Sequence, residues 1–347
     1  MIEHRNNKQN SFFGNYVYDK VVKKEHLLRK INEIVDFSFV NKQCRDLYCL
    51  NNGRPGWSPS LMFKILFLQF MYDLSDYAIE EELYDRLSFK MFIGLEVEEP
   101  PPDHSSVSRF RDRLGVERFK KIFNKIVELA RDKGVISDKL HIVDATEVKA
   151  KVDLYRLKKE HRDSHPKDYI DRHSPDPDAR SGRKYKGKPF YGYQAHCAMD
   201  AESEVIVNID AAPGDVREHT QLKPLLQESP SPKVVTADKA YDCQENHRYL
   251  SENHIRNGIM LKKFHTKEYL KTHIQRVSRK ARKFRQHIEH KMAHLKRYHG
   301  LAKARYWGCT KVRIQTYLAA MCSNVKRLVQ LCFGDTFRTK ICLKGTY

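Results

Sequence analysis

The sequence predicts a two-part α/β protein in which a mainly α-helical N-terminal domain precedes a mixed β-sheet flanked by helices. At 347 residues the chain is long enough to bury two cores. Helical periodicity dominates residues 1–125, whereas short runs rich in Val and Ile begin near residue 138. Because these runs alternate with helical segments, we expect one sheet with helices packed on it.

The N-terminal part begins its clearest helix at Ser58-Pro59, where a capping residue precedes a proline in the first turn. The apolar residues that follow recur on one predicted face at Leu61, Ile65, Leu68 and Tyr72. A second helix is expected to open at Ser75 or Asp76 and to run to Met91.

An acidic stretch and an Arg-rich helix follow. Residues 73–103 hold ten acidic residues against two basic ones, a net charge of −8. We interpret this stretch as a solvated face, with docking on the basic C-terminal region as the alternative. In the helix predicted over residues 105–114, Arg109 and Arg113 share a face and are suited to reading guanine edges in DNA. A purely structural role for both is the alternative.

The C-terminal part contains the predicted sheet. Strands are expected at residues 140–146, 190–200, 205–213, 233–238 and 256–262. Helices are expected at residues 220–228, 243–253, 311–331 and around Glu289. The polar segment 149–188 is predicted to be a long mobile insertion, either disordered or ordered by DNA.

The chain is strongly basic, with a formal net charge of +20 and a pI of about 9.5. Residues 262–305 alone hold fifteen Lys or Arg against Glu268 and Glu289, a net charge of +13. Such a stretch predicts a polyanionic partner. Nucleic acid fits better than a membrane, because the same stretch carries Tyr, Phe, His and Gln side chains suited to polar contacts.

No targeting or membrane signal is visible in the sequence. The first ten residues are polar, and the longest apolar run, residues 61–71, is too short to span a bilayer. The eight cysteines are scattered without a CxxC pair. We therefore expect reduced thiols in a cytoplasmic protein that associates with the nucleoid when it is bound to DNA.

Three carboxylates are candidates for a metal site. Asp144 and Asp238 each follow a run rich in Val and Ile, and Glu289 stands among cations. Phosphodiester cleavage needs an activated oxygen nucleophile and neutralised phosphate charge, which two Mg²⁺ ions about 3.5–4 Å apart supply. Mg²⁺ prefers carboxylate oxygens. Taken alone, each Asp has a turn or cap role as its alternative, and Glu147 and Asp242 are rival ligands. Asp242 is better placed to cap the helix that begins near Cys243.

The helix that carries Glu289 also places cations beside it. Arg285, Glu289 and Lys296 lie within about 40° of one another around a helix of 3.6 residues per turn. An adjacent apolar stripe can face a core and consists of Phe284, Ile288 and Leu295. The alternative is an Arg285–Glu289 ion pair at i,i+4 spacing, worth about 0.2–0.5 kcal/mol.

Several stretches carry a family resemblance when they are taken in order along the chain. They are residues 57–95, 102–114, 143–150 (VDATEVKA), 177–196, 234–242 (VVTADKAYD) and 285–308. Together they resemble the DDE transposases of bacterial insertion sequences, specifically the InsH-type group. The resemblance covers roughly residues 15–330, and the ordered set of stretches makes it specific.

The resemblance implies a ribonuclease H-like core in which Asp144, Asp238 and Glu289 are the catalytic residues. It implies that these three hold Mg²⁺, with Mn²⁺ as a substitute. It also implies cleavage of DNA at the terminal inverted repeats of the element. Attack of the 3′-hydroxyl on target DNA then follows.

The resemblance further implies DNA contacts along the Glu289 helix. Arg285 and Lys296 match signature positions of the family, whereas Arg282 stands where the family has a tyrosine. We count Arg282 with Lys239 and Arg305 among the candidate DNA contacts, with ordinary surface charge as the alternative for Lys239.

The expected organisation is an end-recognition domain at residues 1–130, a DDE catalytic domain at 135–331 and a tail at 332–347. We expect a homodimer on DNA. One alternative function is a catalytically inactive, transposase-derived DNA-binding protein, against which the presence of all three carboxylates argues. The other is a ribonuclease H-like nuclease without strand transfer.

Overall fold

The computed structural model divides into two compact units, which are described separately. The helical unit comprises residues 1–129 and 321–347, and the sheet unit comprises residues 130–320. The described residues are 12–48, 56–159, 166–183, 189–227, 230, 232–262, 274, 276–279 and 281–334. Residues 335–347 of the predicted tail therefore lie outside the described residues.

The helical unit contains several short helices and most of the long helix α7. They are α1 (Phe12–Val21), α2 (Leu27–Ile34), α3 (Phe39–Gln43), the 3-10 turn η1 (Arg45–Leu47), α4 (Pro59–Met71), α5 (Asp76–Asp85), α6 (Leu87–Ile93) and α7 (His104–Asp132). The last part of α14 (Cys309–Phe333) also belongs to this unit. Among the described helices, none combines the length and the apolar character that crossing a bilayer requires.

Helix α4 forms the centre of the helical unit's core. Its side chains from Leu61 to Met71 are buried except for Lys64, so the prediction of a single apolar face is wrong. The reason is packing on several sides, because α3, α5 and α6 all contact α4. The Phe67 ring, for example, lies 5.5 Å from Phe37 and 6.1 Å from Phe92, centroid to centroid.

The second predicted helix differs from the expectation in length, whereas the third ends where it was expected to end. The helix that begins after Ser75 stops at Asp85, because Arg86 adopts an extended conformation and separates α5 from α6. The predicted Ser75 cap is confirmed, since the Ser75 hydroxyl accepts a hydrogen bond from Ala78 N at 3.0 Å. The third predicted helix, residues 105–114, ends at Gly115, whose φ of 68° is not helical, and a second helix within α7 continues from there to Asp132.

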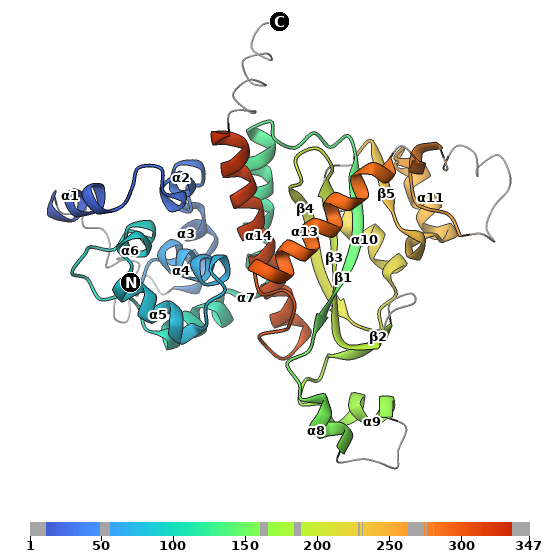
Figure 1. Cartoon of the computed structure of the whole chain (residues 1–347), viewed down its shortest axis with the longest axis horizontal. Helices are drawn as coiled ribbons and strands as arrows, with labels where there is room; N and C mark the ends of the chain where they lie inside the picture. The colour runs from blue at the N-terminus through green and yellow to red at the C-terminus, as the bar shows by residue number, and fades with distance from the viewer. Residues whose placement is uncertain are drawn as a thin grey trace, which may run out of the picture. The chain divides into compact units, whose positions relative to one another are not determined.

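The sheet unit contains six strands and several helices (Figure 1). The strands are β1 (His141–Lys149), β2 (Arg180–Arg183), β3 (Pro189–Asp200), β4 (Ile206–Pro213), β5 (Val234–Ala237) and β6 (Arg256–Asn257). The helices and 3-10 turns are α8 (Leu154–Lys159), α9 (Pro166–His173), η2 (Glu218–Gln221), α10 (Leu222–Gln227), η3 (Lys239–Tyr241), α11 (Gln244–Glu252), η4 (Arg282–Phe284), α13 (Arg285–Tyr298) and the start of α14.

Strand β1 lies at the centre of this sheet. It pairs antiparallel with β3 along its whole length and parallel with β5, and β5 pairs parallel with β6. Beyond β3, the hairpin partner β4 is antiparallel, which confirms the predicted hairpin. The order β4–β3–β1–β5–β6 with these directions is that of a ribonuclease H-like sheet, and α13 runs across it over β1 (Figure 1).

Two predicted segments differ from the sheet as observed. The polar segment 149–188, predicted as a mobile insertion, contains α8, α9 and β2, which pairs with the start of β3. Its residues 160–165 and 184–188 lie outside the described residues. The last predicted strand, 256–262, is reduced to the two residues of β6, and the chain after it continues beside β5 through single hydrogen bonds.

Asp138, immediately before β1, gives the sheet unit a testable pH dependence. Burial alone would raise the pKa of this carboxyl group, but hydrogen bonds from His141 (2.8 Å) and Arg131 (3.1 Å) outweigh it and hold the pKa at about 2. Because the folded-state pKa is depressed, the stabilisation is fully present above about pH 4 and is lost as the pH falls towards 2.

We therefore expect acid to destabilise the wild type by about 2 kcal/mol more than Asp138→Asn between about pH 5 and pH 2. Urea unfolding followed at several pH values measures this difference. Parallel stability profiles for the two proteins would contradict the assignment.

Candidate active site

Asp144 and Asp238 occupy neighbouring positions on two parallel strands. The register of β1 with β5 pairs Val143 with Ala237, so the next residue on each chain is one of the two carboxylates. The residues before them anchor this register in the core, since Val143 is 1% exposed and Ala237 is fully buried. Both carboxylates are half-buried, so they are fixed by the sheet and still open to solvent.

One oxygen of each carboxylate is oriented by its own backbone. Asp144 Oδ1 accepts a hydrogen bond from Ala145 N at 2.8 Å, and Asp238 Oδ1 accepts one from Ala240 N at 2.7 Å. Asp238 thereby caps η3, so the alternative cap interpretation holds for this residue. The capping hydrogen bond also restricts the Asp238 rotamer, so it holds the carboxylate in one position where it can act as a metal ligand.

Two buried groups that the sequence analysis did not single out lie close to these carboxylates. Burial raises the pKa of the Tyr241 hydroxyl, and the negative charges of Glu218, Asp144 and Asp238 raise it further. Cys197 pairs with Asp144 across β1 and β3, and burial followed by the Asp144 charge raises the pKa of its thiol. Both groups are therefore neutral at physiological pH, and no buried charge competes with the two carboxylates from these positions.

Glu289 lies on an exposed edge of α13. The helix packs on the sheet through an apolar stripe formed by Ile288, Met292 and Leu295. At one end of the exposed edge, the Arg285 guanidinium contacts the Met260 sulfur. At the other end, Lys296 Nζ lies 3.6 Å from Glu147 Oε1 on β1. Glu289 thus lies between two residues that tie this edge to the sheet.

The contact between Arg285 and Met260 connects α13 with strand β5, which Asp238 follows directly. Met260 N donates a hydrogen bond to Ala237 O at 3.0 Å, and Ala237 immediately precedes Asp238. The Glu147 contact lies three residues beyond Asp144 on the same strand. The edge that carries Glu289 therefore borders the chain segments of both aspartates.

The structure nevertheless does not gather all three carboxylates into one metal-binding group. Within the described part of the chain, no three His, Cys, Asp or Glu side chains are arranged to hold a metal ion. Asp144 and Asp238 are brought together, and their oxygen donors match the preference of Mg²⁺. Glu289 is exposed on α13, which packs over β1. The alternative Arg285–Glu289 ion pair is also absent from the ion pairs of the described residues.

The two rival carboxylates have other partners. Asp242 is 2% exposed and accepts hydrogen bonds from His247 Nε2 at 2.7 Å and Lys262 N at 2.5 Å. It does not cap α11, as its position before Cys243 suggested, because the carboxylate turns towards these two partners. Glu147 pairs with Lys296.

The predicted DNA contacts of the sheet unit are spread over several elements. Lys239 is exposed beside Asp238, and Arg305 is half-buried with its backbone N–H bonded to Gln315 Oε1 at 2.8 Å. The Arg282 side chain lies outside the described residues, although its backbone forms the start of η4.

Arg109 and Arg113 of the helical unit are both exposed. The Arg109 side chain bonds back to Ser105, to the carbonyl at 3.2 Å and to the hydroxyl at 2.8 Å. The Arg113 guanidinium lies over the Tyr48 ring, 5.9 Å from its centroid. Their role in DNA reading stays a prediction.

The partners of Asp242 predict a structural role that can be separated from the site. We expect Asp242→Ala to lower the free energy of unfolding by about 2 kcal/mol, because it removes the buried acceptor of the part-buried Lys262 N–H and of the His247 ring. Asp238→Asn should change it by less than about 1 kcal/mol, because an asparagine side-chain oxygen can still cap η3. Urea unfolding of both variants makes the comparison, and equal losses would contradict it.

Comparison with known proteins places these features in a family. Residues 16–113 match the model of the transposase domain (DUF772), and residues 137–325 match that of the transposase DDE domain. The transposase for insertion sequence element IS1106 of Neisseria meningitidis serogroup B is 36% identical over 152 residues, which make up 44% of this chain and 52% of that relative. The match thus spans about half of that relative's length.

A solved piggyBac transposase synaptic complex with hairpin DNA shows 11% identity and a TM-score of 0.35, covering 91% of this chain and 81% of that one. A score this low carries no argument about function. The transposase DDE domain model, by contrast, matches more than half of the chain and includes Asp144, Asp238 and Glu289. The chain belongs to the family of transposase DDE domains.

Proposed function

We propose that this protein is a DNA transposase that cleaves DNA at the ends of an insertion sequence and transfers the resulting 3′-hydroxyl into target DNA. In this proposal Asp144, Asp238 and Glu289 are the catalytic residues. The observation that carries it is the β1–β5 register, which sets two carboxylates from distant parts of the chain side by side. Membership in the DDE family supports a role for this pair as metal ligands in the proposed reaction.

The proposed metal ligands are the same three carboxylates, and the proposed ion is Mg²⁺, with Mn²⁺ as a substitute. Bound there, the metal supplies a Lewis acid for the phosphate and an activated oxygen nucleophile. The protein's own contribution is to hold the carboxylates in fixed positions. Backbone hydrogen bonds orient Asp144 and Asp238, and the neutral Tyr241 and Cys197 beneath them leave the carboxylates as the local negative charge.

The proposed partners are the terminal inverted repeats and target DNA, bound by a homodimer. A net charge of +20 supports a polyanionic partner. Arg285 and Lys296 flank Glu289 on one helix edge, so both are placed to neutralise phosphates next to the carboxylates. A cytoplasmic location remains part of the proposal, and the six cysteines of the described residues are free thiols.

The two alternatives make different use of the same residues. A catalytically inactive DNA-binding protein has no need of the paired, oriented aspartates. A ribonuclease H-like nuclease needs them but does not join strands. Strand transfer therefore separates the proposed function from the nuclease, and strand cleavage separates it from the inactive protein.

The first functional prediction concerns the three carboxylates. Asp144→Asn, Asp238→Asn and Glu289→Gln should each lower DNA cleavage and joining at least about 100-fold in Mg²⁺, because each removes a charged ligand from the proposed site. Supercoiled plasmid carrying the element ends is the substrate, and nicked, linear and joined products are measured on gels. DNA affinity without metal serves as the control and should not fall.

If all three variants nick and join DNA as well as the wild type, the site assignment is wrong. If only Glu289→Gln retains activity, the aspartates stand and the third ligand must be sought elsewhere. Cleavage without joining by the wild type would favour the nuclease.

The second functional prediction uses the Glu147–Lys296 contact. Lys296→Gln should reduce the slope of log binding constant against log salt by about one, as the loss of one phosphate contact does. Glu147→Gln should instead tighten DNA binding at low salt, because it removes the carboxylate that pairs with Lys296. Fluorescence anisotropy with a duplex probe measures both. Equal slopes for Lys296→Gln and the wild type would remove Lys296 from the DNA interface.

A further inference from the structure

A basic pocket lies at the opposite end of the parallel strands from Asp144 and Asp238. Its volume is about 710 Å³. Leu140, Val234 and Arg256 line it, and each stands at or immediately before the first residue of β1, β5 or β6. Because these strands are parallel, their amino ends meet at one edge of the sheet, whereas the aspartates lie towards the carboxyl ends.

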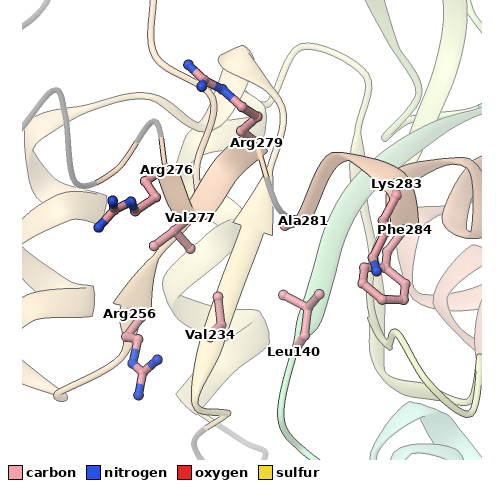
Figure 2. A pocket seen from close by; sticks show the side chains of 9 residues that line it. All are labelled: Leu140, Val234, Arg256, Arg276, Val277, Arg279, Ala281, Lys283 and Phe284. Atoms are coloured by element: carbon pink, nitrogen blue, oxygen red, sulfur yellow. The ribbon is translucent and has the colours of Figure 1, made fainter.

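The lining of this pocket combines cations with apolar side chains. Three arginines and one lysine contribute the charge, namely Arg256, Arg276, Arg279 and Lys283. The other lining residues are apolar, namely Leu140, Val234, Val277, Ala281 and Phe284. Figure 2 shows Leu140, Val234 and Val277 between the three arginines, which lie towards the left and top with their guanidinium groups at the rim, and Lys283 and Phe284, which lie at the right. No acidic side chain is among the lining residues that the structure describes.

This combination selects a class of ligand. Four cations without a lining carboxylate favour an anion. A bare inorganic anion would leave the apolar surface of the pocket unused. A nucleotide unit of DNA carries both required parts, a phosphate for the cations and a sugar and planar base for the apolar surface and the ring. The volume also falls within the range of about 300–1,000 Å³ that is typical of small-molecule sites.

The pocket is connected to the catalytic carboxylates through two elements. Asp144 lies four positions after Leu140, and Asp238 lies four positions after Val234. At about 3.3 Å per residue this is about 13 Å along the strands, the axial rise of about four nucleotide steps of one DNA strand. Lys283 and Phe284 belong to η4, which leads directly into α13 and Glu289.

We propose that this pocket is a second DNA-binding site, which holds the sugar-phosphate backbone and one nucleoside of the bound DNA about four nucleotides from the catalytic carboxylates. Arg256 and Lys283 lie at opposite ends of the pocket lining and contact different phosphates of the strand. The Phe284 ring, whose centroid lies 4.9 Å from the Lys283 ammonium, packs against the nucleoside between them. The proposal rests on the proposed function in so far as it takes DNA as the substrate. It assigns to DNA a set of residues separate from the cations that flank Glu289.

Salt-dependent binding of the full chain tests the phosphate contacts. The pair Arg256→Gln/Lys283→Gln should reduce the slope of log binding constant against log salt for a fluorescent duplex by about two. The matched control is Lys223→Gln/Arg248→Gln, which removes the same two charges from exposed positions on α10 and α11 outside the pocket lining. It should leave the slope within the error of the wild type.

Equal slopes for the pocket pair and the control pair would overturn the proposal. Circular dichroism and thermal unfolding verify that both double variants are folded. Because the four exchanged side chains are exposed, we expect both to unfold at the wild-type temperature. The Arg256→Lys/Lys283→Arg pair, which keeps the charge, should restore the wild-type slope and separates charge loss from misfolding.

Photocrosslinking tests the base contact independently. Duplexes with 5-iodouracil at successive positions near the cleaved end should crosslink to the peptide that contains Phe284 at one position only, about four nucleotides from the scissile bond. Crosslinks that map only to other peptides would remove Phe284 from the site. Polyglutamate is the competing polyanion. If the pocket variants lose polyglutamate binding but keep the wild-type DNA slope, the pocket takes an acidic peptide instead.

These outcomes are distinguishable from failure of the proposed function. If the wild type binds and cuts DNA while the pocket variants behave like the control pair, only the pocket assignment fails. If the wild type neither binds nor cuts element-end DNA, the transposase proposal itself fails, and the pocket proposal fails with it.

Discussion

The register between β1 and β5 is the constraint on which the rest of the site depends. Asp144 and Asp238 are separated by ninety-four positions in sequence, and only the Val143–Ala237 pairing makes them neighbours. A slip of two residues would keep every side chain on its face and still move the carboxylates about 7 Å apart. The full-length pairing of β1 with β3 and the burial of Val143 and Ala237 oppose such a slip.

The three proposed catalytic residues are held by different kinds of force. Asp144 and Asp238 are positioned by the backbone hydrogen bonds between β1 and β5, which do not depend on the conformations of the two side chains. Glu289 depends on side-chain packing, through the apolar stripe of α13 and the two ties to Met260 and Glu147. A helix that rests on an apolar face can shift with less cost than a strand can change register. This difference accounts for a structure in which the aspartates are paired and Glu289 stands at the edge beside them.

The sequence predicted the parts of this architecture that depend on local pattern. The apolar runs before Asp144 and Asp238 identified their strands, and the Ser75 cap and the β3–β4 hairpin were also predicted from the sequence. Features that depend on distant partners were not predicted. The two-residue β6 has too short a pattern to be recognised, and the burial of α4 on several sides follows from the helices around it. Asp242 looked like a cap until its partners, the nearby His247 and the more distant Lys262, were visible. Tyr241 became relevant only because its burial places it within the electrostatic influence of both carboxylates.

Charge connects the proposed metal binding with the proposed DNA binding. The chain carries a net charge of +20, yet the proposed cleavage point holds two adjacent carboxylates. The buried Tyr241 and Cys197 are neutral there, and Lys296 is paired with Glu147. The Lys291 ammonium, whose charge lowers the pKa of the Cys197 thiol, offsets part of the negative charge. A phosphate approaching this point without a cation meets repulsion from the same groups that the proposed chemistry requires. Cations placed farther along the DNA can hold it without entering the site, and the basic pocket at the other end of the strands supplies four of them. The distribution of charge therefore favours two separate roles in the proposed function. Remote cations provide affinity for DNA, and the carboxylates bind a phosphate only when a metal ion is also bound.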